Sequence, residues 1–182
     1  MKKITHLILI VAVALTLTAC GGDPTGNIKD EGAEVIRTVK DGVLQYDTSV
    51  TVGGALDGYD YFKSTSWDTY ETSQGRTVVE FNGVMDLDAY EGTRVIYVLS
   101  SDMIDEAKDQ EVEITYEAKF SLSKSDDSFE VIYSGLHITG KDNGEDIAHD
   151  KPDDDMSGLE SIYKNQPEPE TKNILYLLGT SS

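Results

Sequence analysis

The chain has 182 residues but only one cysteine, Cys20, and three histidines. A single thiol cannot form an internal disulfide, so the fold must depend on its hydrophobic core. The close sets of cysteine and histidine that zinc sites need are absent. There is no Gly-x-Ser-x-Gly motif, and His137 and His149 are predicted to be solvated side chains. The sequence therefore predicts no catalytic residues.

Basic residues are also scarce. There are 15 lysines and arginines against 34 aspartates and glutamates, which gives a formal net charge of -19. So acidic a surface repels phosphate backbones, which excludes nucleic acid as a partner. Solubility and self-repulsion are the simplest interpretation of this acidity. Binding of a cationic partner or a metal is the alternative.

No hydrophobic run is long enough to span a membrane. The longest apolar stretch covers residues 4–17 and is shorter than the about 20 apolar residues of a spanning helix. Lys2 and Lys3 precede it, and small residues follow it at 18–19. A positive end, a short apolar run and small residues at the cut are typical of a secretory signal peptide, which we predict over residues 1–19.

The residues around the predicted cut, Leu17-Thr18-Ala19-Cys20, resemble the lipobox of bacterial lipoproteins. The resemblance implies cleavage before Cys20 and a covalent diacylglycerol on its sulfur, which anchors the protein to the outer face of a bacterial membrane. Gly21 follows the cysteine, as in lipoproteins sent to the outer membrane of cells that have one. We expect no other cofactor, because nucleotides are scarce outside the cytoplasm.

The next segment, residues 20–34, is rich in glycine and charge and offers little to bury. We predict that it is a flexible tether, and thirteen such residues would hold the domain about 20 Å from the membrane. Residues 35–182 have the length of a single domain. We expect one acidic domain there, with a C-terminal helix and tail.

Hydrophobic periodicity predicts an α+β fold. Thr51 is expected to cap a helix that runs to about Phe62. Residues 66–72 and 76–85 form one predicted hairpin, and 111–123 and 129–139 form another, since apolar and polar residues alternate along 111–123. Residues 86–110 are predicted to be a helical or mixed insertion. Together these segments predict about four antiparallel strands with helices packed on one face.

Acidic residues crowd into residues 142–155, which we predict to be a loop. A short helix over 156–165, ended by Pro167, and an apolar patch over 173–178 are expected to follow. Carboxylate oxygens in a short loop are calcium ligands, but the EF-hand spacing is absent, so no metal is expected. The weak candidates for calcium are Asp142, Asp146, Asp150, Asp153, Asp154 and Asp155, and a second small cluster is Asp86, Asp88 and Glu91.

The chain is rich in tyrosine, with ten tyrosines beside one tryptophan. Tyr59, Tyr61, Trp67 and Tyr70 lie close together in sequence. Tyrosine and tryptophan are favoured at interfaces because they bury a large area at low entropic cost. These four residues are either core residues or part of a face that binds protein or glycan.

Three segments carry a further resemblance: 51–59 with Trp67, Gly75-Arg-Thr-Val-Val-Glu-Phe-Asn-Gly83, and Phe129-Glu-Val-Ile-Tyr133. They are similar to uncharacterised exported bacterial domains, and their order of elements resembles one repeat of the β-lactamase inhibitor proteins. The resemblance covers about residues 43–140 and implies the fold and the location, with no catalytic residues.

These features lead to three hypotheses about function. We expect a membrane-anchored, non-enzymatic domain that binds a protein or an envelope polymer. One alternative is a small envelope hydrolase that uses a pair of carboxylates. The other is a calcium-dependent binding module.

Overall fold

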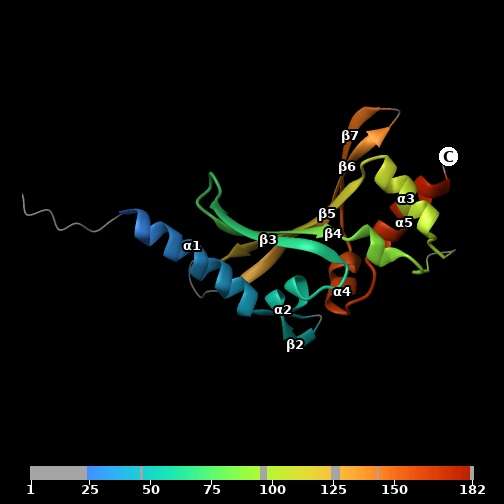
Figure 1. Ribbon diagram of the computed structural model, residues 1–182. Helices are drawn as coiled ribbons and strands as arrows, with labels where there is room; N and C mark the ends of the chain where they lie inside the picture. The colour runs from blue at the N-terminus through green and yellow to red at the C-terminus, as the bar shows by residue number, and fades with distance from the viewer. Residues whose placement is uncertain (1–23, 46, 95–97, 124–127, 143, 181–182) are drawn as a thin grey trace, which may run out of the picture.

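The computed structural model describes residues 24–45, 47–94, 98–123, 128–142 and 144–180. The predicted signal peptide and Cys20 lie outside these residues. Over the described residues the structure is α+β, with a five-stranded antiparallel sheet, a two-stranded sheet and five α-helices (Figure 1). The α+β class and the antiparallel pairing predicted from the sequence are thus confirmed.

The large sheet has the strand order β3-β4-β5-β6-β7, so each strand pairs with its neighbour in sequence. Its strands are β3 (Phe62–Glu71), β4 (Thr77–Met85), β5 (Glu113–Leu122), β6 (Phe129–Asp142) and β7 (Glu145–Pro152). Both predicted hairpins are present, β3 with β4 and β5 with β6. The small sheet pairs β1 (Val43–Leu44) with β2 (Asp47–Thr51).

The expectation of about four strands was wrong, because the predicted acidic loop over 142–155 contains a fifth strand. β7 pairs with β6 from Asp142 opposite Glu145 to Gly135 opposite Pro152. Gly144 lies in the connecting turn with φ +83°, a conformation that favours glycine. As the edge strand, β7 is held by backbone pairing to β6 and its side chains are mostly exposed, so it needs no alternating apolar pattern.

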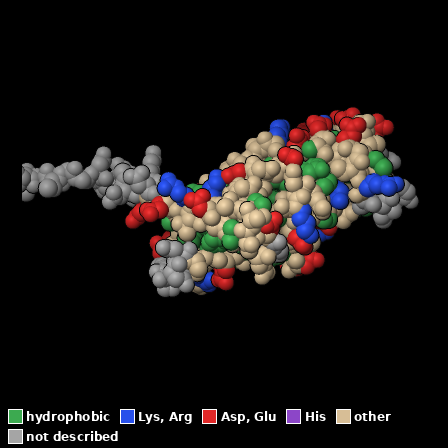
Figure 2. Space-filling model, turned by 90° about the horizontal axis from the view of Figure 1, so that it is seen from below, with side chains coloured by type: hydrophobic (Ala, Val, Ile, Leu, Met, Phe, Trp, Pro, Cys, Tyr) green, Lys and Arg blue, Asp and Glu red, His purple; other side chains and the backbone are tan. Residues whose placement is uncertain are grey.

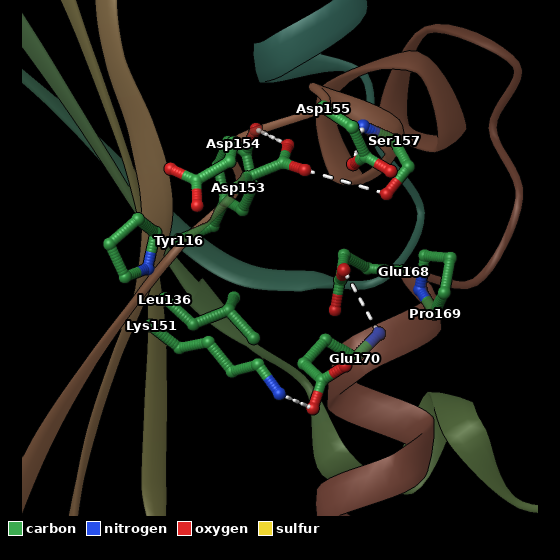
Figure 3. A pocket seen from close by; sticks show the side chains of 11 residues that line it. Tyr116, Leu136, Lys151, Asp153, Asp154, Asp155, Ser157, Glu168, Pro169 and Glu170 are labelled. Atoms are coloured by element: carbon green, nitrogen blue, oxygen red, sulfur yellow. Dashed lines mark hydrogen bonds and ion pairs between the residues drawn. The ribbon is translucent and has the colours of Figure 1, made fainter.

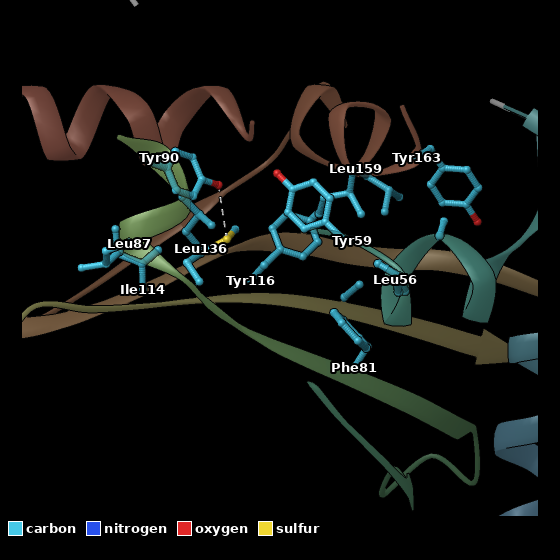
Figure 4. Packing of buried hydrophobic residues seen from close by; sticks show 14 of the residues in the cluster. Leu56, Tyr59, Phe81, Leu87, Tyr90, Ile114, Tyr116, Leu136, Leu159 and Tyr163 are labelled. Carbon is cyan, nitrogen blue, oxygen red and sulfur yellow. Dashed lines mark hydrogen bonds between the residues drawn. The ribbon is translucent and has the colours of Figure 1, made fainter. Parts of the chain in front are cut away.

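The helices pack on one face of the large sheet (Figure 4). They are α1 (Pro24–Asp41), α2 (Val52–Asp57), α3 (Ser101–Asp109), α4 (Ser157–Tyr163) and α5 (Pro169–Thr180), with a 3-10 turn η1 at Leu87–Tyr90. Val39, Leu56 and Leu159 from three of these helices join Phe81 and Tyr116 of the sheet in the core, and all five are buried. Burial of such side chains is the main source of stability in a domain of this size.

The segments whose sequence pattern is weaker, 86–110, 156–165 and 173–178, also contain helices. The insertion at 86–110 contains η1 and α3, so a mixed insertion is confirmed, and its residues 95–97 lie outside the described residues. The helix expected at 156–165 is α4. The apolar patch at 173–178 belongs to α5, which packs beside α3, with Met103 against Gly179. None of the described helices has the length and apolar character to span a membrane.

Helix α1 occupies most of the segment that the sequence predicts to be a flexible tether. It begins at Pro24, so residues 24–34 are helical in the structure. Its later part packs on the core through Val35, Ile36 and Val39, while Gly32 passes close to Thr69. This packing fixes the last turns of the helix, and the earlier turns continue from them at a small cost per residue, since only the first turn of a helix is costly to form.

Helix α2 begins where the sequence predicts, with Thr51 as its N-cap. The Thr51 hydroxyl accepts a hydrogen bond from Gly54 N at 3.0 Å. The helix ends at Asp57, earlier than expected, because the chain turns at Gly58 and enters β3 at Phe62. At Gly58 a Cβ atom would lie only 2.5 Å from the Gly54 carbonyl oxygen, so the turn requires glycine.

We expect Thr51→Ala to lower the free energy of unfolding by about 1 kcal/mol, because the amide of Gly54 loses its acceptor. Urea denaturation followed by circular dichroism measures the change. Thr51→Ser keeps the hydroxyl and should retain most of the stability. Equal losses in the two variants would contradict a capping role.

Candidate functional site

A cavity of about 370 Å³ lies where β6 and β7 meet the first turns of α4 and α5 (Figure 3). Five carboxylates line it, together with the buried Tyr116 and one cation, Lys151. The five acids are Asp153, Asp154, Asp155, Glu168 and Glu170. Lys151 is ion-paired with Glu170 at the cavity wall. The cavity therefore carries an excess of negative charge.

Asp153 connects the end of β7 to the start of α4. Its Oδ1 accepts a hydrogen bond from Gly158 N at 3.1 Å, and its Oδ2 accepts one from Leu159 N at 3.0 Å. Its own amide donates to Ser134 O at 2.8 Å, which ties the turn to β6. A carboxylate at this place satisfies amides of the first helical turn that have no partner within the helix.

Glu168 has the same role at the start of α5. Its two carboxylate oxygens accept hydrogen bonds from the amides of Glu170 and Thr171. Pro169 is the first residue of the helix, a position where proline is favoured because its missing amide is not needed. Glu168 is only 4% exposed, so this carboxylate is almost fully enclosed.

Three buried tyrosines surround the two carboxylates. The Tyr59 hydroxyl donates to Gln166 O and accepts from Glu168 N, both at 2.8 Å. The Tyr116 hydroxyl donates to Asp153 Oδ2 at 3.3 Å. Burial raises the pKa of Tyr59, Tyr90 and Tyr116. All three are therefore neutral at physiological pH and can act as hydrogen-bond donors.

Asp153 and Glu168 face each other across Gly158. A Cβ atom on Gly158 would lie 2.9 Å from Asp153 Oδ2 and 3.1 Å from Glu168 Oε1. Burial raises the pKa of Glu168, and the negative charge of Asp153 acts in the same direction. The amides of Thr171 and Glu170 oppose this shift, because they stabilise the ionised form.

The four aromatic residues that the sequence groups together do not form one surface. Tyr59 is buried in the core, and the ring of Tyr61 lies 5.2 Å from its ring. Trp67 packs on Phe81 with ring centroids 4.9 Å apart, and its Nε1 donates to Asp57 at 2.8 Å. Tyr70 is 42% exposed and lies on the opposite face of β3, because side chains alternate along a strand.

The acidic residues named as calcium candidates are spread along β7 and the turn after it. Asp146 and Asp150 are exposed on β7, while Asp153, Asp154 and Asp155 follow the strand. The side chain of Asp142 lies outside the described residues. Among the residues that are described, no group of three or more acidic, histidine or cysteine side chains could hold a metal ion.

The remaining candidates lie on exposed surface. His137 and His149 are both exposed, as expected, and His137 Nδ1 lies 2.6 Å from Asp150 Oδ1. In the second acidic cluster, Asp86 caps η1 by accepting from Asp88 N at 3.2 Å. Asp88 of the same cluster is ion-paired with Lys108 of α3, so these two acids hold η1 in place.

Sequence reasoning missed Glu168. The only signal for it is local: an acidic residue directly before a proline is a suitable helix cap. Nothing in the sequence indicates that Glu168 lies beside Asp153, because that contact depends on the packing of α4 and α5 against the sheet. No family model, curated protein or solved structure matches the chain. From its fold and its cavity, the described part of the chain is an acidic α+β domain with a carboxylate-lined pocket.

Proposed function

We propose that the chain is an exported lipoprotein, anchored through a lipid on Cys20, whose domain binds a cationic group of a protein or an envelope polymer without catalysing a reaction. The observation that carries the proposal is the concentration of five carboxylates around one cavity whose lysine is already paired. Carboxylates on a concave wall attract a positive ligand, because low-dielectric walls focus the field.

The overall charge supports the same class of ligand. The chain's formal net charge is -19, and removal of the predicted signal would take away two more lysines. Figure 2 shows acidic side chains spread over one side of the molecule, with a group at the end remote from α1. Long-range attraction would raise the association rate of a basic partner and would weaken with added salt.

An ammonium or guanidinium group fits the chemistry of the cavity. Each oxygen of Glu168 accepts one amide hydrogen bond and has room for a second donor, whereas the oxygens of Asp153 are shared between amides and the hydroxyls of Tyr116, Ser134 and Ser157. Asp154 and Asp155 are exposed at the rim, where they can meet a donor without losing a buried partner. A lysine or arginine side chain is the simplest ligand with such donors.

One observation favours the alternative of a hydrolase that uses two carboxylates. Asp153 and Glu168 face each other in a pocket, and burial raises the pKa of Glu168, as in a general acid. However, both acids hold the first turns of helices through all four of their oxygens. This structural role accounts for their position, so we favour binding.

Binding can be tested by calorimetric titration with tetralysine at low salt. We expect a dissociation constant that rises about tenfold in the double variant Asp154→Asn/Asp155→Asn, since the loss of two rim charges weakens the attraction for the lysines. The matched control is Glu71→Gln/Glu130→Gln, which removes two exposed charges elsewhere on the sheet. No heat with tetralysine, or the same weakening in both variants, would contradict a specific site. Release of sugar ends from cell-envelope polymer would instead support the hydrolase.

The anchor has its own test. Cells that express the chain are labelled with radioactive palmitate and then fractionated. We expect label and membrane association for the native chain and neither for Cys20→Ala. Label that persists in Cys20→Ala would refute lipidation at this residue.

A further inference from the structure

The first turns of α4 and α5 are held by two carboxylates that lie side by side. Asp153 binds the amides of Gly158 and Leu159, and Glu168 binds those of Glu170 and Thr171. A Cβ atom placed on Gly158 would lie within 3.1 Å of both carboxylates, so the two acids are close neighbours. The two helix starts therefore meet at a pair of like charges whenever both acids are ionised.

The amides of Glu170 and Thr171 stabilise the ionised form of Glu168, but no cation among the described residues faces it. The groups that face it are the hydroxyls of Tyr59, Tyr90 from η1 and Tyr116 from β5, and the carboxylate of Asp153. None of these is a cation. Lys151 and Glu170 lie at the same cavity and are paired with each other. Ionisation of Glu168 thus adds a second negative charge in a largely enclosed place.

We infer that Glu168 and Asp153 form a pH-sensitive latch, in which a proton on Glu168 holds α4 and α5 closed at the pocket and its loss loosens them. A like charge at short range in a buried site is unfavourable, and removing it by protonation stabilises the packed arrangement. The inference rests on the proposed function only in assigning a cationic ligand to the pocket.

The direction of the effect follows from linkage. Burial raises the pKa of Glu168 above its ordinary value of 4.5, so the folded chain binds this proton more tightly than the unfolded chain. The stability that the group contributes is therefore complete at pH values below 4.5 and is lost as the pH rises through the folded-state pKa. The tyrosines do not take part, because burial raises their pKa values and keeps them neutral.

Hydrogen exchange measured by NMR on the ligand-free chain tests the latch. Exchange rates at pH 4.0, below the ordinary pKa of 4.5, and at pH 7.5 are divided into the intrinsic rates to give protection factors. We expect the protection factors of the Gly158, Leu159, Glu170 and Thr171 amides to fall several-fold at the higher pH relative to Phe81 in β4. In Glu168→Gln this relative fall should disappear, whatever the overall stability of the variant. Equal protection at both pH values, or a fall that persists in Glu168→Gln, would overturn the inference.

A direct titration of Glu168 avoids dependence on the variant. The carboxyl carbon of Glu168 in the native chain, followed by NMR from pH 3 to 8, should titrate with a midpoint above 4.5. A midpoint at or below that value would overturn the latch even if Glu168→Gln does not fold.

Titration with tetralysine at the same two pH values separates the latch from the ligand. We expect tighter binding at pH 7.5, because the loosened pocket carries one more negative charge, and a smaller gain in Glu168→Gln, which keeps only the other four acids of the pocket. If the chain binds tetralysine but its amide protection does not depend on pH, the latch is refuted and the binding role stands. An exchange effect with no binding would refute the proposed function and leave the latch.

Discussion

Replacing Phe81 by alanine should lower the free energy of unfolding by about 3–5 kcal/mol, the range for removing a large aromatic side chain from a core. Phe81 is fully buried, and its ring centroid lies 4.9 Å from that of Trp67 and 5.5 Å from that of Phe62. These neighbours belong to the adjacent strand β3, whose pairing with β4 fixes their backbone. The cavity left by the missing ring therefore cannot close readily.

Urea denaturation followed by the fluorescence of Trp67, the single tryptophan, measures this loss. The matched control is Ile132→Ala on β6, because Ile132 is 44% exposed. Its substitution should change stability by no more than about 0.5–1 kcal/mol. Similar losses for the two variants would mean that Phe81 is not at the centre of the core.

Asp153→Ala is expected to cost about 2–4 kcal/mol, the second largest effect. The substitution removes the acceptor for two amides of α4 and for the hydroxyl of Tyr116, and buried donors without a partner are costly. It also relieves the charge that faces Glu168, which offsets part of the loss. Differential scanning calorimetry should show a clearly lower melting temperature.

The neighbouring acid supplies the control for this prediction. Asp154 is exposed, so Asp154→Ala should change the stability by about 0.5 kcal/mol or less. Asp153→Asn keeps one side-chain oxygen and should fall between the native chain and Asp153→Ala. If Asp154→Ala is as destabilising as Asp153→Ala, the acidic run acts through total charge rather than through the cap.

The sequence predicted those parts of the fold that have one buried and one solvated face. Along β5, Ile114, Tyr116, Ala118 and Phe120 are all buried, and their alternation indicated a strand. Strand β7 was not predicted, because an edge strand that is solvated on both faces needs no alternation of apolar and polar residues. Its acidic residues resemble those of a loop, and its pairing is made by the backbone.

The candidate site was predictable only in part. Asp153 belongs to an acidic run that the sequence singled out, although as a weak calcium candidate rather than as a helix cap. Glu168 lies fifteen positions later and carries no periodic signal. Their meeting depends on where α4 and α5 pack, and such long-range juxtaposition is not encoded in any local pattern.

Helix α1 alters how a lipid on Cys20 would constrain the domain. The later turns of α1 pack on the body, and the turns before Gly32 span about 12 Å at 1.5 Å per residue, whereas a coil of similar length would bend in every direction. With lipidation as proposed, a stiff rod would separate the anchor from the body and narrow the range of angles that the body can sample. Since α1 lies at one end of the molecule and α5 at the other (Figure 1), the pocket beside α5 would be presented outward, toward ligands in solution or on a facing surface, and away from the headgroups.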